Sequence, residues 1–179
     1  MDIISLLNDF LKLIEEDKVE IYNEFSLQHE LGIFLRDRLP DYKVQFERNA
    51  KFFGITGTVK HEIDIVIYDD TYRCAIELKF PLNGQYPEQM YSFVKDIKFM
   101  EEMKESGFDE TYCFSIVEDR NFYSGEKVDG IYSFFRAGTK IKGTIDKPTG
   151  KKPEQIQLNG VYEVAWKNCG TRCYYLVKI

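Results

Sequence analysis

Charged side chains inside two short apolar segments are the feature that most constrains how this chain can fold. The segments are residues 61–68 (HEIDIVIY) and 72–80 (YRCAIELKF), and the turn-forming pair Asp69-Asp70 joins them. Runs rich in Ile, Val and Leu, bounded by turn residues, are typical of buried strands. A carboxylate or lysine buried there costs free energy unless it meets a counter-charge or a metal ion. The two segments therefore predict a pair of strands that carries a polar site.

Side-chain alternation predicts how these polar groups are placed. Asp64 shares a strand face with Glu62, and Glu77 shares one with Lys79. A hairpin loop at residues 70 and 71 would put Asp64 directly across from Glu77, whereas a loop one residue earlier would make them diagonal neighbours. Either register gathers the two carboxylates and the lysine on one face. The opposite face of the first segment would then carry Ile63, Ile65 and Ile67.

Such a face suits a metal ion. Two adjacent carboxylates raise each other's pKa, and a divalent cation between them reverses the effect. Oxygen ligands suit Mg²⁺ or Mn²⁺, which keep bound water and accept phosphate oxygens. The metal acidifies a water molecule and neutralises charge on a phosphodiester, while a nearby lysine orients the water or stabilises the transition state. These residue types therefore favour metal-assisted phosphodiester hydrolysis.

The spacing of these residues resembles a known motif. Asp64, a gap of twelve residues and then Glu77-Leu78-Lys79 is similar to the PD-(D/E)xK motif of the restriction-endonuclease-like nucleases. Ile63 stands where that motif normally has proline. The resemblance implies that Asp64, Glu77 and Lys79 are catalytic. It also implies that Asp64, Glu77 and the Leu78 carbonyl bind the metal, with Lys79 orienting or stabilising.

The flanking segments follow the order of elements in this family, which is helix, three antiparallel strands, helix, strand. Leucines at helical spacing and Pro40 predict the first helix, and Pro87 opens the second, which ends before Gly107. The expected segments are a helix over 25–39, a strand over 42–53, the two strands already described, a helix from residue 87, and a strand over 111–117. An acid and a lysine across a hairpin are also common on a solvated sheet face. The apolar surroundings and the order of elements favour the site, so the expected fold is a mixed α/β (α+β) fold with a restriction-endonuclease-like core.

Many family members add an acidic metal ligand from the first helix, and two residues qualify here. Glu24 shares the inward face of Leu27 and Leu31, whereas Glu30 lies about a quarter turn away. We favour Glu24 and keep Glu30 as the alternative. Gln45 and Glu47 share a face of the first strand and could reach the same cleft, while Gln85 and Gln89 resemble the helix glutamines of some branches of the family.

The last third of the chain predicts further β-structure outside the resemblance. β-branched and aromatic runs over 140–145, 156–158, 161–166 and 173–179 are separated by glycines. Asn159-Gly160 is the strongest hairpin signal in the chain. We therefore expect a nuclease-like core over 1–119 and a β-rich extension over 120–179 that packs on it within the same structural domain.

The charge distribution bears on nucleic-acid binding. A net charge of −6 argues against indiscriminate binding, because phosphate contacts supply most non-specific affinity. One basic stretch, with Asp146 as its single acid, could follow a phosphate backbone or could be a solvated loop. Its residues are Arg136, Lys140, Lys142, Lys147, Lys151 and Lys152. By family analogy, DNA is favoured over RNA as the partner.

Residues 1–16 have apolar side chains at helical spacing, but acids replace the basic start of a signal peptide. They predict an amphipathic helix that packs on the domain, with a partner-binding edge as the alternative. No apolar stretch approaches the about 20 residues that span a membrane. The four cysteines form no disulfide framework, and Cys74 and Cys113 fit core positions. We expect a reduced, cytoplasmic protein without a membrane partner.

The resulting hypothesis is a Mg²⁺- or Mn²⁺-dependent endodeoxyribonuclease that cleaves by in-line attack of a metal-activated water. The alternatives are a non-catalytic nucleic-acid- or protein-binding module on the same fold, and a subunit that needs a partner; a homodimer stays open. Two observations would favour a non-catalytic module. One is Asp64 and Glu77 pointing apart, and the other is an ion pair between Lys79 and Glu62.

Overall fold

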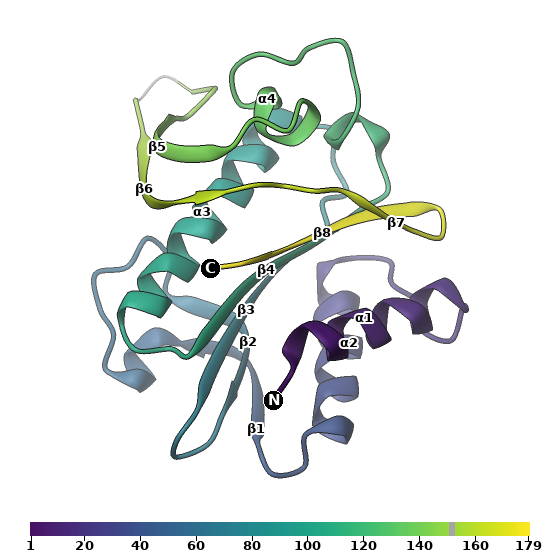
Figure 1. The fold of residues 1–179 in the computed structure, drawn as a ribbon, viewed down its shortest axis with the longest axis vertical. Helices are drawn as coiled ribbons and strands as arrows, with labels where there is room; N and C mark the ends of the chain where they lie inside the picture. Colours follow the sequence, from purple (N-terminus) through teal and green to yellow (C-terminus); the bar gives the residue numbers. More distant parts are fainter. Residues whose placement is uncertain (151–152) are drawn as a thin grey trace.

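A computed structural model describes residues 1–150 and 153–179 of the chain. The described part forms a mixed α/β fold in which a six-stranded sheet, in the order β1-β2-β3-β4-β8-β7, lies between helices (Figure 1). Strands β5 and β6 form a separate two-stranded sheet. Along the chain the elements are α1 (Ile3–Glu15), α2 (Glu24–Arg38), β1 (Lys43–Asn49), the 3-10 helix η1 (Ala50–Phe53), β2 (Glu62–Tyr68), β3 (Arg73–Lys79), α3 (Tyr86–Glu105), β4 (Glu110–Val117), the 3-10 helix η2 (Arg120–Phe122), α4 (Tyr132–Arg136), β5 (Ile141–Asp146), β6 (Gln155–Tyr162), β7 (Lys167–Cys169) and β8 (Arg172–Lys178).

The centre of the sheet has the expected order of elements. After α2, strands β1, β2 and β3 pair antiparallel, and α3 then crosses over so that β4 pairs parallel to β3. A parallel neighbour requires such a crossover, because a tight turn can only join antiparallel strands. The first strand is shorter than expected, because the chain turns into η1 at Ala50 and leaves it at Gly54, whose φ of +80° favours glycine.

Helices cover both faces of the sheet. In Figure 1, α1 and α2 lie on one side of the strands and α3 lies on the other. Each side has its own apolar core. Helix α1 buries its apolar stripe in the core beside α2, so the predicted packed N-terminal helix is confirmed. Its buried residues are Ile3, Leu7, Phe10, Leu11 and Ile14.

Local caps determine where α2 begins. The Asn23 side chain accepts a hydrogen bond from the backbone N–H of Ser26 (2.7 Å), and the Ser26 hydroxyl accepts one from the N–H of Asn23 (3.0 Å). This reciprocal capping box satisfies amide groups that a helix start leaves without partners. Glu24 is consequently the first residue of the helix and faces the ends of β2 and β3 rather than the middle of the sheet.

The prediction that side chains alternate strictly between the two faces of β2 is wrong at Ile63. Ile65 packs in the core under α1 and α2 as expected, but Ile63 packs with Val66 in the core under α3. The pairing of β1 with β2 is interrupted at the same level, where Glu47 has a φ of +47°. A left-handed residue turns its own strand, β1, and the ladder lacks the pair of Glu47 with Asp64 while the register on either side is unchanged. The irregularity lies next to Asp64, beside the strand that carries the polar site.

The C-terminal part extends the central sheet and adds a hairpin-like layer. Strand β8 pairs antiparallel with β4, and β7 pairs with β8. Strands β5 and β6 pair with each other and contact α3. The prediction of a hairpin at Asn159-Gly160 is wrong, because both residues lie within β6.

The physical reason for this error is a buried carboxylate on α3. Strand β6 bulges at this point, since Lys142 pairs with Val161 while Gly143 pairs with Leu158. The two amides that the bulge frees donate to the Glu101 carboxylate, from Asn159 N at 2.9 Å and from Gly160 N at 2.6 Å.

Two further expectations concern membranes and cysteines. Within residues 1–150 and 153–179, no helix has the length and apolar character needed to cross a membrane. All four cysteines are buried and free, which confirms Cys74 and Cys113 as core residues.

Candidate functional site

A polar cleft lies between the start of α2, the start of β2 and the end of β3. Its cavity has a volume of about 260 Å³, and an adjoining hollow continues past Asp64 toward His61 and Glu62. The cleft is lined by Glu24, Phe25, Gln28, Glu47, Lys60, Asp64, Leu78 and Lys79. Four of the predicted site residues, the expected metal ligands Glu24, Asp64 and Leu78 and the expected catalytic Lys79, therefore line one cleft, although they come from three different elements. Glu77 is buried and does not line it.

Asp64 and Glu77 are neighbours on adjacent strands. The N–H of Asp69 donates to the Tyr72 carbonyl (3.0 Å), so the tight loop is residues 70 and 71, and the register is the first of the two considered above. The N–H of Asp64 donates to Glu77 Oε1 (3.3 Å), and the N–H of Leu78 donates to Asp64 Oδ2 (2.7 Å). Each carboxylate thus accepts a backbone hydrogen bond from the other's strand.

Lys79 is held by two acids from opposite sides of the sheet. Its Nζ lies 3.4 Å from Glu24 Oε1 and 3.6 Å from Asp96 Oδ2, and it donates to the Leu78 carbonyl at 3.1 Å. Its recorded ion pairs are thus with α2 and α3, not with Glu62. Glu24 is further fixed because its Oε2 accepts the N–H of Phe80 (3.1 Å).

Two residues of this cluster were missed from the sequence. The Lys60 ammonium donates to Glu77 Oε2 and to Asp96 Oδ1, the latter at 2.8 Å. Asp96 lies on α3 and is 3% exposed; within the described structure its Oδ2 is buried without a hydrogen-bond partner. One signal could have found Asp96, since it interrupts the apolar stripe of α3 between Phe93 and Ile97. Lys60 lies outside both strands, and its position carries no comparable signal.

Burial sets the electrostatics of the cluster. Glu77 is only 1% exposed, and burial together with the charge of Asp64 raises its pKa well above the usual value, against the opposing effect of Lys60. Burial likewise raises the pKa of Asp64 to about 6, although Lys60 and Lys79 act to lower it. Burial lowers the pKa of each lysine, but the surrounding carboxylates, led by Asp96, outweigh it and raise both pKa values. The lysines therefore remain charged, whereas Asp64 and Glu77 ionise less readily than they would in water.

Of the other residues predicted near the site, Glu47 lines the cleft and the rest do not. Gln28 Nε2 donates to Glu47 Oε1 (2.7 Å) and to the Asp64 carbonyl (2.8 Å), which ties α2 to the irregular part of the sheet. Glu30 does not line the cleft. Gln45 accepts a hydrogen bond from the Tyr68 hydroxyl, and Gln85 and Gln89 lie at the start of α3 near Asn83, outside the cleft.

The donor set can be tested against a divalent cation. Across the described residues, no group of three or more His, Cys, Asp and Glu side chains has the arrangement of a metal site. Mg²⁺, however, is commonly held by one or two carboxylates and several waters. Asp64, Glu77 and the Leu78 carbonyl supply oxygens of that kind. Carboxylates also outnumber lysines in the cluster, whose charged members are Glu24, Glu47, Lys60, Asp64, Glu77, Lys79 and Asp96. The residues fit a hard divalent cation.

Two side chains of the basic stretch, Arg136 and Lys147, make hydrogen bonds or ion pairs within the protein. The Arg136 guanidinium donates to the backbone carbonyls of Asn121 and Lys127, each with a bond of 2.9 Å. Lys147 is paired with Glu154 at 2.8 Å. Lys140 and Lys142 are exposed, and Lys151 and Lys152 lie outside the described residues. The described residues of this stretch do not line the cleft.

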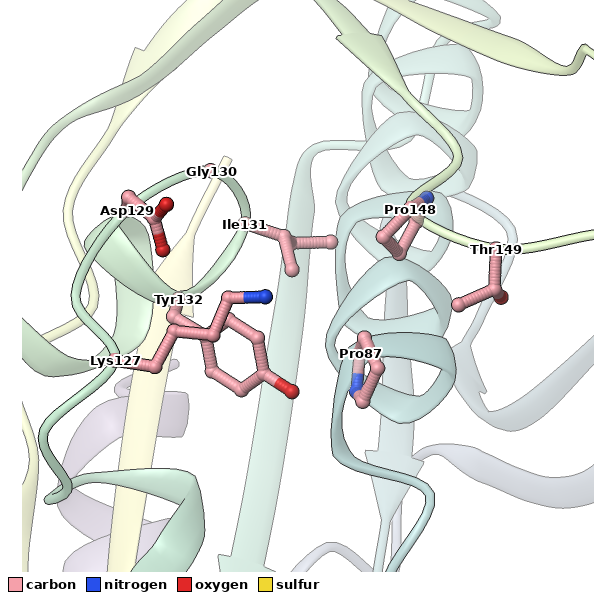
Figure 2. Close-up of a pocket in the computed structure, with 8 residues that line it drawn as sticks. All are labelled: Pro87, Lys127, Asp129, Gly130, Ile131, Tyr132, Pro148 and Thr149. Carbon is pink, nitrogen blue, oxygen red and sulfur yellow. The ribbon is translucent and has the colours of Figure 1, made fainter.

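A second pocket lies at the start of α3, between the loop before α4 and the β5–β6 connection (Figure 2). Its volume is about 180 Å³. The Lys127 side chain lies across the Tyr132 ring, with Nζ 5.1 Å from the ring centroid. Asp129 is the acid that lines it among the described residues, so the pocket offers no pair of carboxylates.

Comparisons with protein-family models, with curated proteins and with solved structures gave no match to this chain. Its function is therefore inferred from the fold and the cleft.

Proposed function

We propose that the protein is a metal-dependent nuclease of the restriction-endonuclease-like class that hydrolyses phosphodiester bonds in DNA. The observation that carries the proposal is the adjacency of Asp64 and the buried Glu77 across β2 and β3, with Asp64 and Lys79 lining the same cleft. The order α2, β1 to β3, α3, β4 supports it, since the motif resembles PD-(D/E)xK in that context. The link to DNA remains an analogy with the family.

The chain's own residues would divide the work. Asp64 and Glu77, with the Leu78 carbonyl, would hold Mg²⁺ or Mn²⁺. The bound ion would lower the pKa of a water molecule and neutralise charge on the scissile phosphate. Lys79 is a fixed cation that can donate to a phosphate oxygen as negative charge develops. Glu24 would position Lys79, and it lines the cleft whereas Glu30 does not.

Cleavage of supercoiled plasmid tests the proposal. We expect nicking in Mg²⁺ or Mn²⁺, none with a chelator, and a loss of at least about a thousandfold in Asp64→Ala and Lys79→Ala, as for other residues that act on the reacting atoms. Glu30→Ala is the matched control and should retain activity. Equal nicking by wild type and Asp64→Ala would contradict the proposal.

One observation favours a non-catalytic module on the same fold. Both oxygens of Glu77 already have partners, because Oε1 accepts the N–H of Asp64 and Oε2 contacts Lys60. A Glu77 carboxylate whose charge is already paired with Lys60 needs no metal. In that case calorimetry with Mn²⁺ would detect no binding, and DNA or protein binding would be unchanged by chelator.

A further inference from the structure

Lys60 occupies the side of Glu77 that a metal would need. Glu77 Oε1 accepts the N–H of Asp64 at 3.3 Å, and Lys60 contacts the other oxygen, Oε2. The Lys60 side chain is 24% exposed and comes from the segment before β2, whereas the Glu77 side chain is fully buried. A buried carboxylate is stable only with a counter-charge, and Lys60 supplies it within the described structure.

An ammonium and a divalent cation cannot share this oxygen at low cost. Two positive charges a few ångströms apart repel strongly where the surroundings are partly buried. Binding of a metal through Glu77 therefore requires Lys60 to withdraw from Oε2. Among the described residues Lys79 pairs with Glu24 and Asp96 and donates to the Leu78 carbonyl, so it does not compete for the Glu77 carboxylate.

Asp96 offers Lys60 a second place. Its Oδ1 already accepts the Lys60 ammonium at 2.8 Å, and its buried Oδ2 has no hydrogen-bond partner among the described residues, although Lys79 Nζ lies 3.6 Å from it. The carboxylate is 3% exposed and is fixed on the long helix α3. A small shift of the flexible lysine toward Asp96 would free Glu77 without leaving the ammonium unpaired.

We propose that Lys60 is a resident cation that competes with the divalent metal for Glu77, and that Asp96 is the acceptor to which Lys60 moves when the metal binds. The inference rests on the proposed metal site and adds a regulatory pair to it. Lys60 and Asp96 are positioning residues here, since neither is assigned a contact with substrate. They would hold Glu77 in place before the metal arrives and would set how tightly it binds.

The proposal predicts opposite effects on Mn²⁺ affinity from two substitutions. Lys60→Met removes the competitor and should tighten binding by roughly tenfold. Asp96→Asn leaves Lys60 on Glu77 alone and should weaken binding by roughly fivefold to tenfold. In the double variant, Asp96→Asn should have little further effect, because the lysine that it redirects is absent. Simple long-range charge effects would instead add, so the double-mutant cycle separates the two accounts.

The measurement is calorimetric titration of the full chain with Mn²⁺, with thermal unfolding in the presence and absence of Mn²⁺ as a second readout. Lys98→Met is the matched control. Lys98 is also a part-buried lysine paired with a buried glutamate, Glu101, at 3.4 Å, and their side chains are 15% and 3% exposed. Its loss should lower stability without changing Mn²⁺ affinity by more than about twofold.

Each outcome is decisive. Equal affinity in wild type and Lys60→Met, with binding lost in Asp64→Ala, would overturn the competition and leave the proposed metal site standing. An additive double-mutant cycle would also overturn it. If none of the proteins binds Mn²⁺, the inference fails together with the proposed function. If Lys60→Met folds only with Mn²⁺, the proposal is supported; if it does not fold at all, Asp96→Asn decides, and affinity equal to or tighter than wild type overturns it.

Discussion

Two buried glutamates, Glu77 on β3 and Glu101 on α3, are satisfied in opposite ways. They are 1% and 3% exposed. Glu101 is surrounded by donors: the backbone amides of Asn159 and Gly160, the Tyr162 hydroxyl at 2.8 Å, and Lys98. Glu77 has one long backbone hydrogen bond and one lysine, and two further acids, Asp64 and Asp96, raise its pKa.

The difference separates structural burial from burial that serves a site. Glu101 stabilises the fold, since its donors come from β6 and hold the second sheet against α3. Glu77 sits among like charges, an arrangement that raises the free energy of the folded protein and that proteins concentrate at functional sites. Four substitutions, at Glu101, Asp64, Glu24 and Tyr162, test this contrast through stability and activity.

The largest effect should come from removing Glu101. Glu101→Ala leaves two backbone amides of β6 and the Lys98 ammonium without their acceptor, and a broken buried pair typically costs about 3 to 5 kcal/mol. Urea unfolding should show this loss. Glu105→Ala is the control, because exposed Glu105 accepts only the Asn159 side chain in the recorded contacts, and its loss should cost less than about 1 kcal/mol. Equal losses would deny Glu101 its structural role.

Asp64→Asn should have the reverse sign and stabilise the metal-free protein. Asp64 has a pKa of about 6 in the folded chain against an ordinary 3.8. Below about pH 3 it is protonated in both states and contributes nothing. As the pH rises toward 6, the unfolded chain ionises first, so wild-type stability falls.

Asp64→Asn keeps an oxygen that accepts the Leu78 N–H, and it removes the free-energy cost of ionising a buried carboxyl group. We expect a gain of about 1 to 3 kcal/mol at neutral pH and almost none below about pH 3, measured by urea unfolding in chelator. A gain that does not change with pH would show that titration of Asp64 is not its cause.

Glu24→Gln should lower nuclease activity by roughly tenfold, which corresponds to about 1.4 kcal/mol in activation free energy. The amide keeps an acceptor for the Phe80 N–H but loses the charge that positions Lys79. Plasmid nicking rates would measure this, with Glu30→Gln as the unaffected control. A larger loss in Glu30→Gln would make Glu30 the functional acid of α2.

The smallest effect should come from Tyr162→Phe. The hydroxyl is one of several donors to Glu101, so the carboxylate stays satisfied and the loss should be about 1 kcal/mol. Thermal unfolding would measure it against Tyr22→Phe, whose side chain is exposed and should be neutral within about 0.5 kcal/mol. A loss as large as that of Glu101→Ala would mean that Tyr162 alone holds the carboxylate.

Much of the frame around the cleft could be predicted from local patterns. Proline and glycine marked the ends of α2 and α3 to within two residues, and apolar runs marked β2, β3 and β4. The adjacency of Asp64 and Glu77 followed from a tight loop and the pleat, because a short hairpin sets which residues face each other. Local patterns failed where a distant group intervened, as Glu101 does at Asn159-Gly160, 58 and 59 residues away.

Nearby residues and side-chain alternation suffice to predict the strand pair and to bring Asp64, Glu77 and Lys79 together. Which further charges meet them depends on the packing of the whole chain. Lys60 reaches Asp96 across 36 residues and Glu24 reaches Lys79 across 55. Contacts of that range depend on how α2 and α3 pack on opposite faces of the sheet, and no local spacing encodes them. The charge balance around Glu77 is therefore a property of the folded chain.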